Sequence, residues 1–172
     1  MNIIKKIILS ASIFVIIFCF LATTLKGAPN LQGQKNKELY ENKIYNISLE
    51  YNGEWKVNPN YIEKYEGKDG FFQISAYAGK GIEIDEIAQS EASHKLRPYG
   101  NSFKITKLSI QGQEARLIMP SNDQSQEFNN QAELIVKYPK EININGNTYN
   151  YFILWADKYN IQEISRTLKF VS

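Results

Sequence analysis

Apolar and polar residues alternate along several stretches of this chain, with the period of two that is typical of strands with one buried face. The clearest case is residues 45–51, where Tyr45, Ile47, Leu49 and Tyr51 are separated by polar residues. The same pattern, or a run of aromatic and β-branched residues, predicts strands at 61–66, 71–78, 103–110, 114–119, 132–138 and 149–156.

Turn residues separate these strands. Glycines at 67 and 70 predict a hairpin, Gly112 predicts a second one, and Asn145-Gly146 is the strongest hairpin signal in the chain. Pro139 is expected to interrupt the strand at 132–138, because proline cannot donate a backbone hydrogen bond. The last strand should place Tyr149, Tyr151, Ile153 and Trp155 on one face.

Two helices are predicted from a change to helical spacing. The first has an apolar stripe between residues 84 and 99, formed by Ile84, Ile87, Ala88, Ala92, Leu96 and Tyr99. Pro98 and Gly100 should end it. The second helix begins at about Asn160, which has capping-box spacing to Glu163. Its apolar stripe is Ile161, Ile164 and Leu168.

The expected order is β-β-β-α-β-β-β-β-α. Because hairpins dominate, the sequence predicts an α+β fold in which an antiparallel sheet of about six to seven strands carries two packed helices. Trp55 and Trp155 are expected in its core, Trp155 beneath a helix.

A hydrophobic segment precedes this domain. Residues 7–25 carry no charge and, as a helix, would span roughly 28 Å, close to the hydrocarbon thickness of a bilayer. Lys5 and Lys6 flank it, so the following chain should lie outside the cytoplasm. Residues 1–27 are therefore interpreted either as a membrane anchor or as a signal peptide, whose cleavage would release the protein. Lipidation of Cys19 is rejected, because Phe18 precedes it where a small residue is required.

Residues 28–43 are mostly polar and are interpreted as a tether, with one helical turn near 37–40, which leaves residues 44–172 as the folded domain. Residues 28–172 contain 17 basic and 18 acidic side chains, so the basic character of the whole chain belongs to its first segment. This balance argues against nucleic-acid binding. The domain has no cysteine, and lysine outnumbers arginine 17 to 3, a bias that suggests an AT-rich bacterial genome.

Short motifs resemble the Mog1/PsbP-like superfamily: the strand at 45–51 followed by Trp55, the stretch Ile110-Gln-Gly112 followed by Ala115, and the final helix leading into Leu168-Lys-Phe170. Asn52 stands where that superfamily usually has a proline. The resemblance implies the α+β fold over most of residues 44–172. It implies no activity, because the superfamily includes photosystem-associated lumenal proteins and a nuclear transport factor and shares no catalytic residue.

Few residues of this sequence are candidates for catalysis or for metal binding. His94 is the only histidine, which excludes a zinc site built from several histidines or cysteines. Glu91 and Lys95 have the spacing of a helical ion pair on the side that faces the core. They are either groups at the mouth of a cleft between helix and sheet or a pair at its rim.

Other candidate sites are weaker. Glu66 and Asp69 lie in a segment typical of a hairpin turn rather than of a metal loop, so no metal or cofactor is expected. The polar loop at 121–130 contains Asp123, Glu127 and Phe128, and such loops often carry function. The candidate binding residues are Glu91, His94, Lys95, Tyr99, Asp123, Glu127 and Phe128.

The sequence favours a non-catalytic binding or accessory module of the bacterial cell envelope, whose partner is a protein or a cell-wall component. Its abundant tyrosine and tryptophan suit a recognition surface, although they also suit a β-rich core. One alternative is an envelope hydrolase that uses Glu91 as a catalytic carboxylate. Another is a structural spacer subunit.

Overall fold

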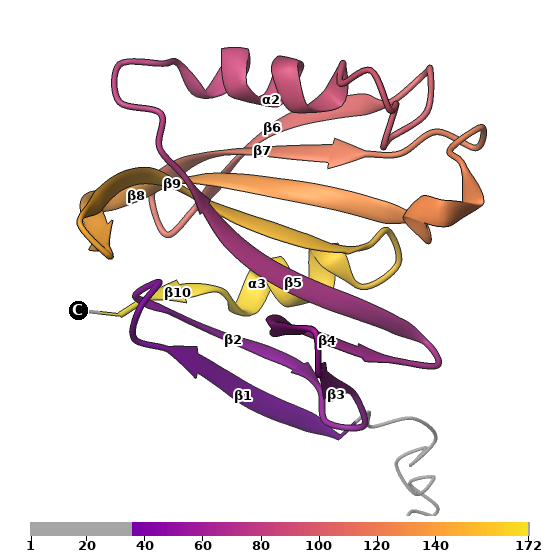
Figure 1. Cartoon of the computed structure of the whole chain (residues 1–172), viewed down its shortest axis with the longest axis horizontal. Coiled ribbons are helices and arrows are strands. Elements are labelled where there is room, and N and C mark those ends of the chain that lie inside the picture. The colour runs from indigo at the N-terminus through magenta and orange to yellow at the C-terminus, as the bar shows by residue number, and fades with distance from the viewer. Residues whose placement is uncertain (1–35, 172) are drawn as a thin grey trace, which may run out of the picture. The chain divides into compact units, whose positions relative to one another are not determined.

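The computed structural model describes residues 36–171, and its main element is an antiparallel sheet of seven strands (Figure 1). The strand order is β3-β4-β5-β9-β8-β7-β6. The strands are β3 (Lys56–Asn58), β4 (Tyr61–Gly67), β5 (Gly70–Tyr77), β6 (Lys104–Ile110), β7 (Gln113–Met119), β8 (Gln131–Ile144) and β9 (Asn147–Asp157). The α+β class and the hairpin-rich sheet predicted from the sequence are confirmed.

A second sheet has three strands in the order β1-β2-β10. They are β1 (Lys37–Asn42), β2 (Ile47–Asn52) and β10 (Lys169–Phe170). The tether predicted for residues 28–43 is therefore wrong over β1, which is paired with β2 and belongs to the folded part of the chain. Strand β1 is an edge strand with Leu39 62% exposed, so it lacks the alternation that marks a half-buried strand.

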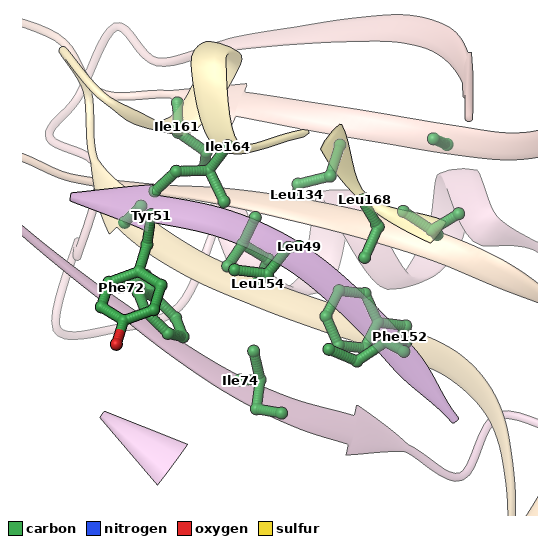
Figure 2. Packing of buried hydrophobic residues seen from close by; sticks show 14 of the residues in the cluster. Leu49, Tyr51, Phe72, Ile74, Leu134, Phe152, Leu154, Ile161, Ile164 and Leu168 are labelled. Carbon is green, nitrogen blue, oxygen red and sulfur yellow. The ribbon is translucent and has the colours of Figure 1, made fainter. Parts of the chain in front are cut away.

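The two helices cover opposite faces of the large sheet, as Figure 1 shows. Helix α3 (Ile161–Thr167) and strand β2 pack on one face, where Leu49, Phe72 and Leu154 lie in the centre of the core (Figure 2). Helix α2 (Ile84–Ala92) packs on the other face against Ile118 and Ile135. Both faces of the central strands are consequently buried.

Helix α2 ends seven residues earlier than the sequence predicts. Ser93 follows its last residue, Ala92, and accepts a hydrogen bond at its Oγ from the Gln89 side chain. Residues 93–100 form turns instead of helix, and Arg97 has a φ of 49°. A residue before proline is disfavoured in the right-handed helical region, so a helix could not run through Arg97-Pro98. Leu96, predicted in the core, is 62% exposed.

Strand β8 does not stop at Pro139 as predicted. It continues to Ile144, and its register with β9 shifts between Lys137 and Ile142. An irregularity of this kind accommodates a residue that cannot donate a ladder hydrogen bond. The hairpin at Asn145-Gly146 is confirmed, because both residues have positive φ, 52° and 83°.

Asn160 does not cap α3 through its side chain, so the predicted capping box is wrong. Its Nδ2 donates instead to the Asp157 carboxylate and to the Asp69 carbonyl oxygen. Gly70 lies against this cluster with a φ of 150°, and a Cβ there would overlap the Asp157 carboxylate. The cluster fastens the β4–β5 hairpin to the end of β9.

Between residues 36 and 171, no helix is long and apolar enough to cross a membrane. The hydrophobic helix predicted at residues 7–25 lies outside the described residues.

Candidate functional site

A depression of about 320 Å³ opens on the α2 side of the large sheet, beyond the last turn of that helix. We call it the α2 depression; its lining residues are Gln73, Glu91, His94, Pro98, Tyr99, Gln131 and Trp155. Gln73 on β5 and Trp155 on β9 are directly paired across the sheet. Because α2 ends at Ala92, this part of the sheet face remains accessible.

Trp155 has a different environment from the other tryptophan. Trp55 is 2% exposed, and its Nε1 donates to Asp69 at 2.6 Å, as expected for a core residue. Trp155 is only half-buried and packs against the edge of the α2 cluster. The prediction that both tryptophans are largely buried therefore holds for Trp55 alone. A half-buried tryptophan in a depression can contact a ligand through its ring.

A buried carboxyl group lies beside this tryptophan. Glu133 on β8 is directly paired with Trp155 and has 0% exposure. The Tyr99 hydroxyl donates to Glu133 Oε2 at 2.5 Å, whereas Oε1 has no hydrogen-bond partner within the described part of the chain. Burial raises the pKa of Glu133 to about 8; the hydrogen bond from Tyr99 opposes this rise, and the Glu91 charge adds to it. The carboxyl is thus mainly protonated at neutral pH.

Tyr99 anchors the turn that follows α2. It is 1% exposed, and burial together with the neighbouring Glu133 raises the pKa of its phenol. Its carbonyl oxygen accepts a hydrogen bond from the backbone N–H of Ser121. Tyr99 was predicted to be a helical residue, but it occupies the core from this turn.

Sequence reasoning missed Glu133. It lies in the predicted strand at 132–138, where the alternation places it with Lys137 on the face expected to be polar. The available signal was Ile135, an apolar residue on that same face, which is buried beneath α2. A glutamate inside a strand with two buried faces is more informative than one on a helix surface.

The structure brings together three of the predicted site residues. Glu91, His94 and Tyr99 all line the α2 depression, and the exposed His94 accepts a hydrogen bond at Nδ1 from the Leu96 backbone. Lys95 does not line it. No ion pair joins Glu91 and Lys95 within residues 36–171, because the helix ends before Lys95 and the one-turn spacing is lost.

The other predicted residues lie in the 121–130 loop, apart from this lining. Asp123 accepts hydrogen bonds from the Ser121 hydroxyl and from Asn101, whose Nδ2 is 2.6 Å away. These bonds lower the pKa of Asp123 to about 2 and close the loop onto residues 99–101. Glu127 and Phe128 belong to the short 3-10 helix η1 (Gln126–Phe128). The loop borders a separate polar depression with Lys158.

Gln124 connects this loop to the α2 depression. Its Nε2 donates to the carbonyl oxygens of Pro98 and Gln131, at 2.6 and 2.8 Å. Both acceptors belong to residues that line the depression. The loop therefore supports the rim of the α2 depression without lining it.

Salt bridges attach the first turn of α2 to the large sheet. Asp85 in its first turn accepts from Arg116 on β7 at 2.5 Å and from Lys107 on β6 at 2.8 Å. The Arg116 and Lys107 hydrogen bonds hold the pKa of Asp85 well below its usual range. Asp85 is thus structural. In the part of the chain from 36 to 171, no three acidic, histidine or cysteine side chains gather as metal ligands would.

Comparisons with known proteins assign neither a family nor an activity to this chain. Neither a scan against protein-family models nor a search of curated proteins finds a match. Among solved structures, the solution structure of cyanobacterial PsbP (CyanoP) from Synechocystis sp. PCC 6803 is similar, with 9% identity and a TM-score of 0.35. The match covers 84% of this chain and 98% of that chain. It agrees with the PsbP-like resemblance seen in the sequence, at the level of the fold, and nothing about activity follows from it.

Proposed function

We propose that this protein is a non-catalytic binding module of the bacterial cell envelope and that the α2 depression holds its ligand. Residues 7–25 would carry the domain to the outer side of the membrane, as an anchor or as a cleaved signal. One observation carries the binding proposal: half-buried Trp155 lies in a depression whose lining includes the polar side chains of Gln73, Glu91, His94 and Gln131.

The depression has unused hydrogen-bonding capacity. The side chains of Gln73 and Glu91 have no hydrogen-bond partner within the described residues, although both are partly buried. Neither side chain has a polar atom that is both buried and unpartnered, so solvent reaches these groups, and a bound molecule could replace that water as their partner. Its volume of about 320 Å³ is at the small end of ligand pockets, so it suits one side chain or a small molecule.

Catalysis by a pair of carboxyl groups agrees less well with the geometry of the α2 depression than ligand binding does. The protonated carboxyl is that of Glu133, and a general acid must come within hydrogen-bond reach of its substrate. Glu133 has 0% exposure, accepts a hydrogen bond from the Tyr99 hydroxyl and is paired with Trp155 on the neighbouring strand. Glu91 at the rim would act alone, without the second carboxyl that glycosidase-type chemistry needs.

The two tryptophans provide a direct test, because the chain contains only Trp55 and Trp155. Full-length protein labelled with ¹⁵N-tryptophan in detergent micelles gives two indole signals, which Trp155→Phe assigns. A library of small neutral, cationic and anionic compounds is then added. We expect some compounds to shift the Trp155 signal in a saturable way and to leave the buried Trp55 signal unchanged.

Two variants complete the test. Trp155→Ala should abolish this binding, whereas Tyr159→Ala should preserve it, because Tyr159 is also aromatic and is 74% exposed but lies outside the depression. If no compound moves the Trp155 signal, or if the shifts elsewhere in the spectrum survive Trp155→Ala, the α2 depression is not the binding site. A spacer subunit would give that result.

A further inference from the structure

The side chains of the α2 depression restrict the charge of its ligand. The lining has one carboxylate, Glu91, and neither lysine nor arginine. The remaining polar groups are the Gln73 and Gln131 amides and the His94 imidazole, while Trp155 supplies an accessible aromatic ring. This combination offers negative charge and π-electron density to a ligand, with no fixed positive charge to attract an anion.

A second feature is a buried carboxyl group beside the depression. Glu133 Oε1 is a buried carboxyl oxygen with no hydrogen-bond partner in residues 36–171. Tyr99 and Trp155, which contact or pair with Glu133, both line the depression, as does Gln131, two residues away on β8. An unsatisfied buried carboxyl costs stability, which makes it informative when it lies beside a candidate site.

We propose that the α2 depression binds an organic cation, namely an ammonium or guanidinium group on a short apolar stem. This proposal rests on the proposed function and names its ligand class. The stem would lie on the Trp155 ring and the Pro98 side chain, and the positive head would lie beside Glu91.

Elementary electrostatics supports this assignment. A cation over a tryptophan ring is attracted by the negative face of the ring, and more strongly when it is partly desolvated. Attraction to Glu91 adds to this effect, and the free amide oxygen of Gln73 can accept from the cation's N–H groups. An anion of equal size would be repelled by Glu91, and the lowered dielectric constant of the site would strengthen this repulsion. A neutral compound would gain neither from the tryptophan ring nor from the Glu91 charge.

Glu133 provides a second, independent readout. A cation bound in the α2 depression favours the ionised form of the nearby Glu133. Binding should therefore release a proton, and the affinity for the cation should rise between pH 6 and 8. The titratable groups that act on Glu133 are Glu91 on α2 and Tyr99, and His94 lines the same depression as these two residues. The strand partners beside Glu133 are Ile118 on β7 and Trp155 on β9, which carry no charge.

Four probes with a short alkyl stem and different head groups test the proposal: n-butylammonium, n-butylguanidinium, n-butanol and butyrate. Each is titrated into the full-length protein while the Trp155 indole signal is followed. Both cations should bind at least about tenfold more tightly than butanol and butyrate, the difference expected from cation–π and carboxylate contacts together. Equal binding of butanol, or tighter binding of butyrate, would overturn the ligand class and leave the depression as a binding site.

Charge-matched variants separate Glu91 from general electrostatics. Glu91→Gln should weaken cation binding about tenfold, whereas Glu86→Gln, which removes the same charge from an exposed position of α2, should leave it unchanged. Equal effects of both variants would overturn the assignment of Glu91. Glu133→Gln should abolish the rise in affinity between pH 6 and 8, and His94→Gln should retain it; the opposite pattern would overturn the role of Glu133.

The source of the cation is distinguished by one further probe. A blocked Gly-Lys-Gly peptide that binds about tenfold more tightly than n-butylammonium indicates a basic side chain of a partner protein or a wall peptide. Equal or weaker binding of the peptide indicates a free small amine. If no probe of any charge moves the Trp155 signal, the proposed function itself fails, which is distinguishable from failure of the ligand class alone.

Discussion

Replacing Glu133 with glutamine should make the domain more stable at neutral pH and should remove most of the pH dependence of its stability. Burial raises the pKa of Glu133 from 4.5 to about 8, so the folded state holds a proton that the unfolded chain releases. This contribution to stability is fully present below pH 4.5 and is lost as the pH rises to about 8. Each pH unit in that interval lowers the free energy of unfolding by about 1.36 kcal/mol.

The total loss for wild type is thus about 5 kcal/mol between pH 4.5 and 8, of which over half has occurred by pH 7. Glutamine keeps the shape of the side chain and cannot ionise. Its amide N–H groups lack a partner at the position of Oε1, which costs about 1 kcal/mol. Glu133→Gln should therefore be about 2–3 kcal/mol more stable than wild type at pH 7 and slightly less stable at pH 5.

Urea unfolding of a chain that begins at Lys35, measured at pH 5, 6, 7 and 8, checks this prediction. Glu127→Gln is the control, because Glu127 is exposed and its replacement should change stability by less than about 0.5 kcal/mol. Carboxylates with lowered pKa, such as Asp85 and Asp123, titrate below this pH interval. If wild type is equally stable from pH 5 to 8, Glu133 is ionised in the folded protein and the reasoning is refuted.

Three further predictions concern location and packing. Protease added to intact protoplasts should digest the folded domain, and its complete protection would contradict an extracytoplasmic location. Trp55→Ala should lower the free energy of unfolding by about 3–5 kcal/mol, and Trp155→Ala should lower it by about half as much, because Trp155 is only half-buried. Equal losses in urea unfolding would place both tryptophans in the core. A chain that begins at Ile44 lacks β1 and should melt at least about 8 °C below one that begins at Lys35, because Tyr40 packs edge-on against Phe72; equal melting temperatures would show that β1 adds nothing.

Local sequence signals predicted the elements that depend on local chemistry. The hairpin at Asn145-Gly146 and the apolar residues of α2 are visible in the sequence because positive φ and helical spacing leave clear patterns. Strand β1 left no pattern, since its residues depend on β2 for pairing and its outer side faces solvent. The assignment of β2 to a separate sheet is a long-range property that no local window contains.

The site could be predicted only in part for a related reason. Glu91, His94 and Tyr99 are near one another in the sequence, so one helix with its following turn was enough to group them. Gln73 and Trp155 join them only through the pairing of β5 with β9, which brings together positions 82 residues apart. The early end of α2, which leaves this group accessible, depended on Ser93 and on the turn that follows it.

The position of Gln124 has a consequence for how this domain can diverge. One amide group fixes the separation of Pro98 and Gln131, and it belongs to a loop that does not line the α2 depression. Loops tolerate insertion and substitution more readily than strands do. Selection could thus alter the width of the depression, and with it the ligand, by varying the 121–130 loop while every lining residue stays the same. Homologues with an identical lining and a different loop should accordingly not be assumed to share a specificity.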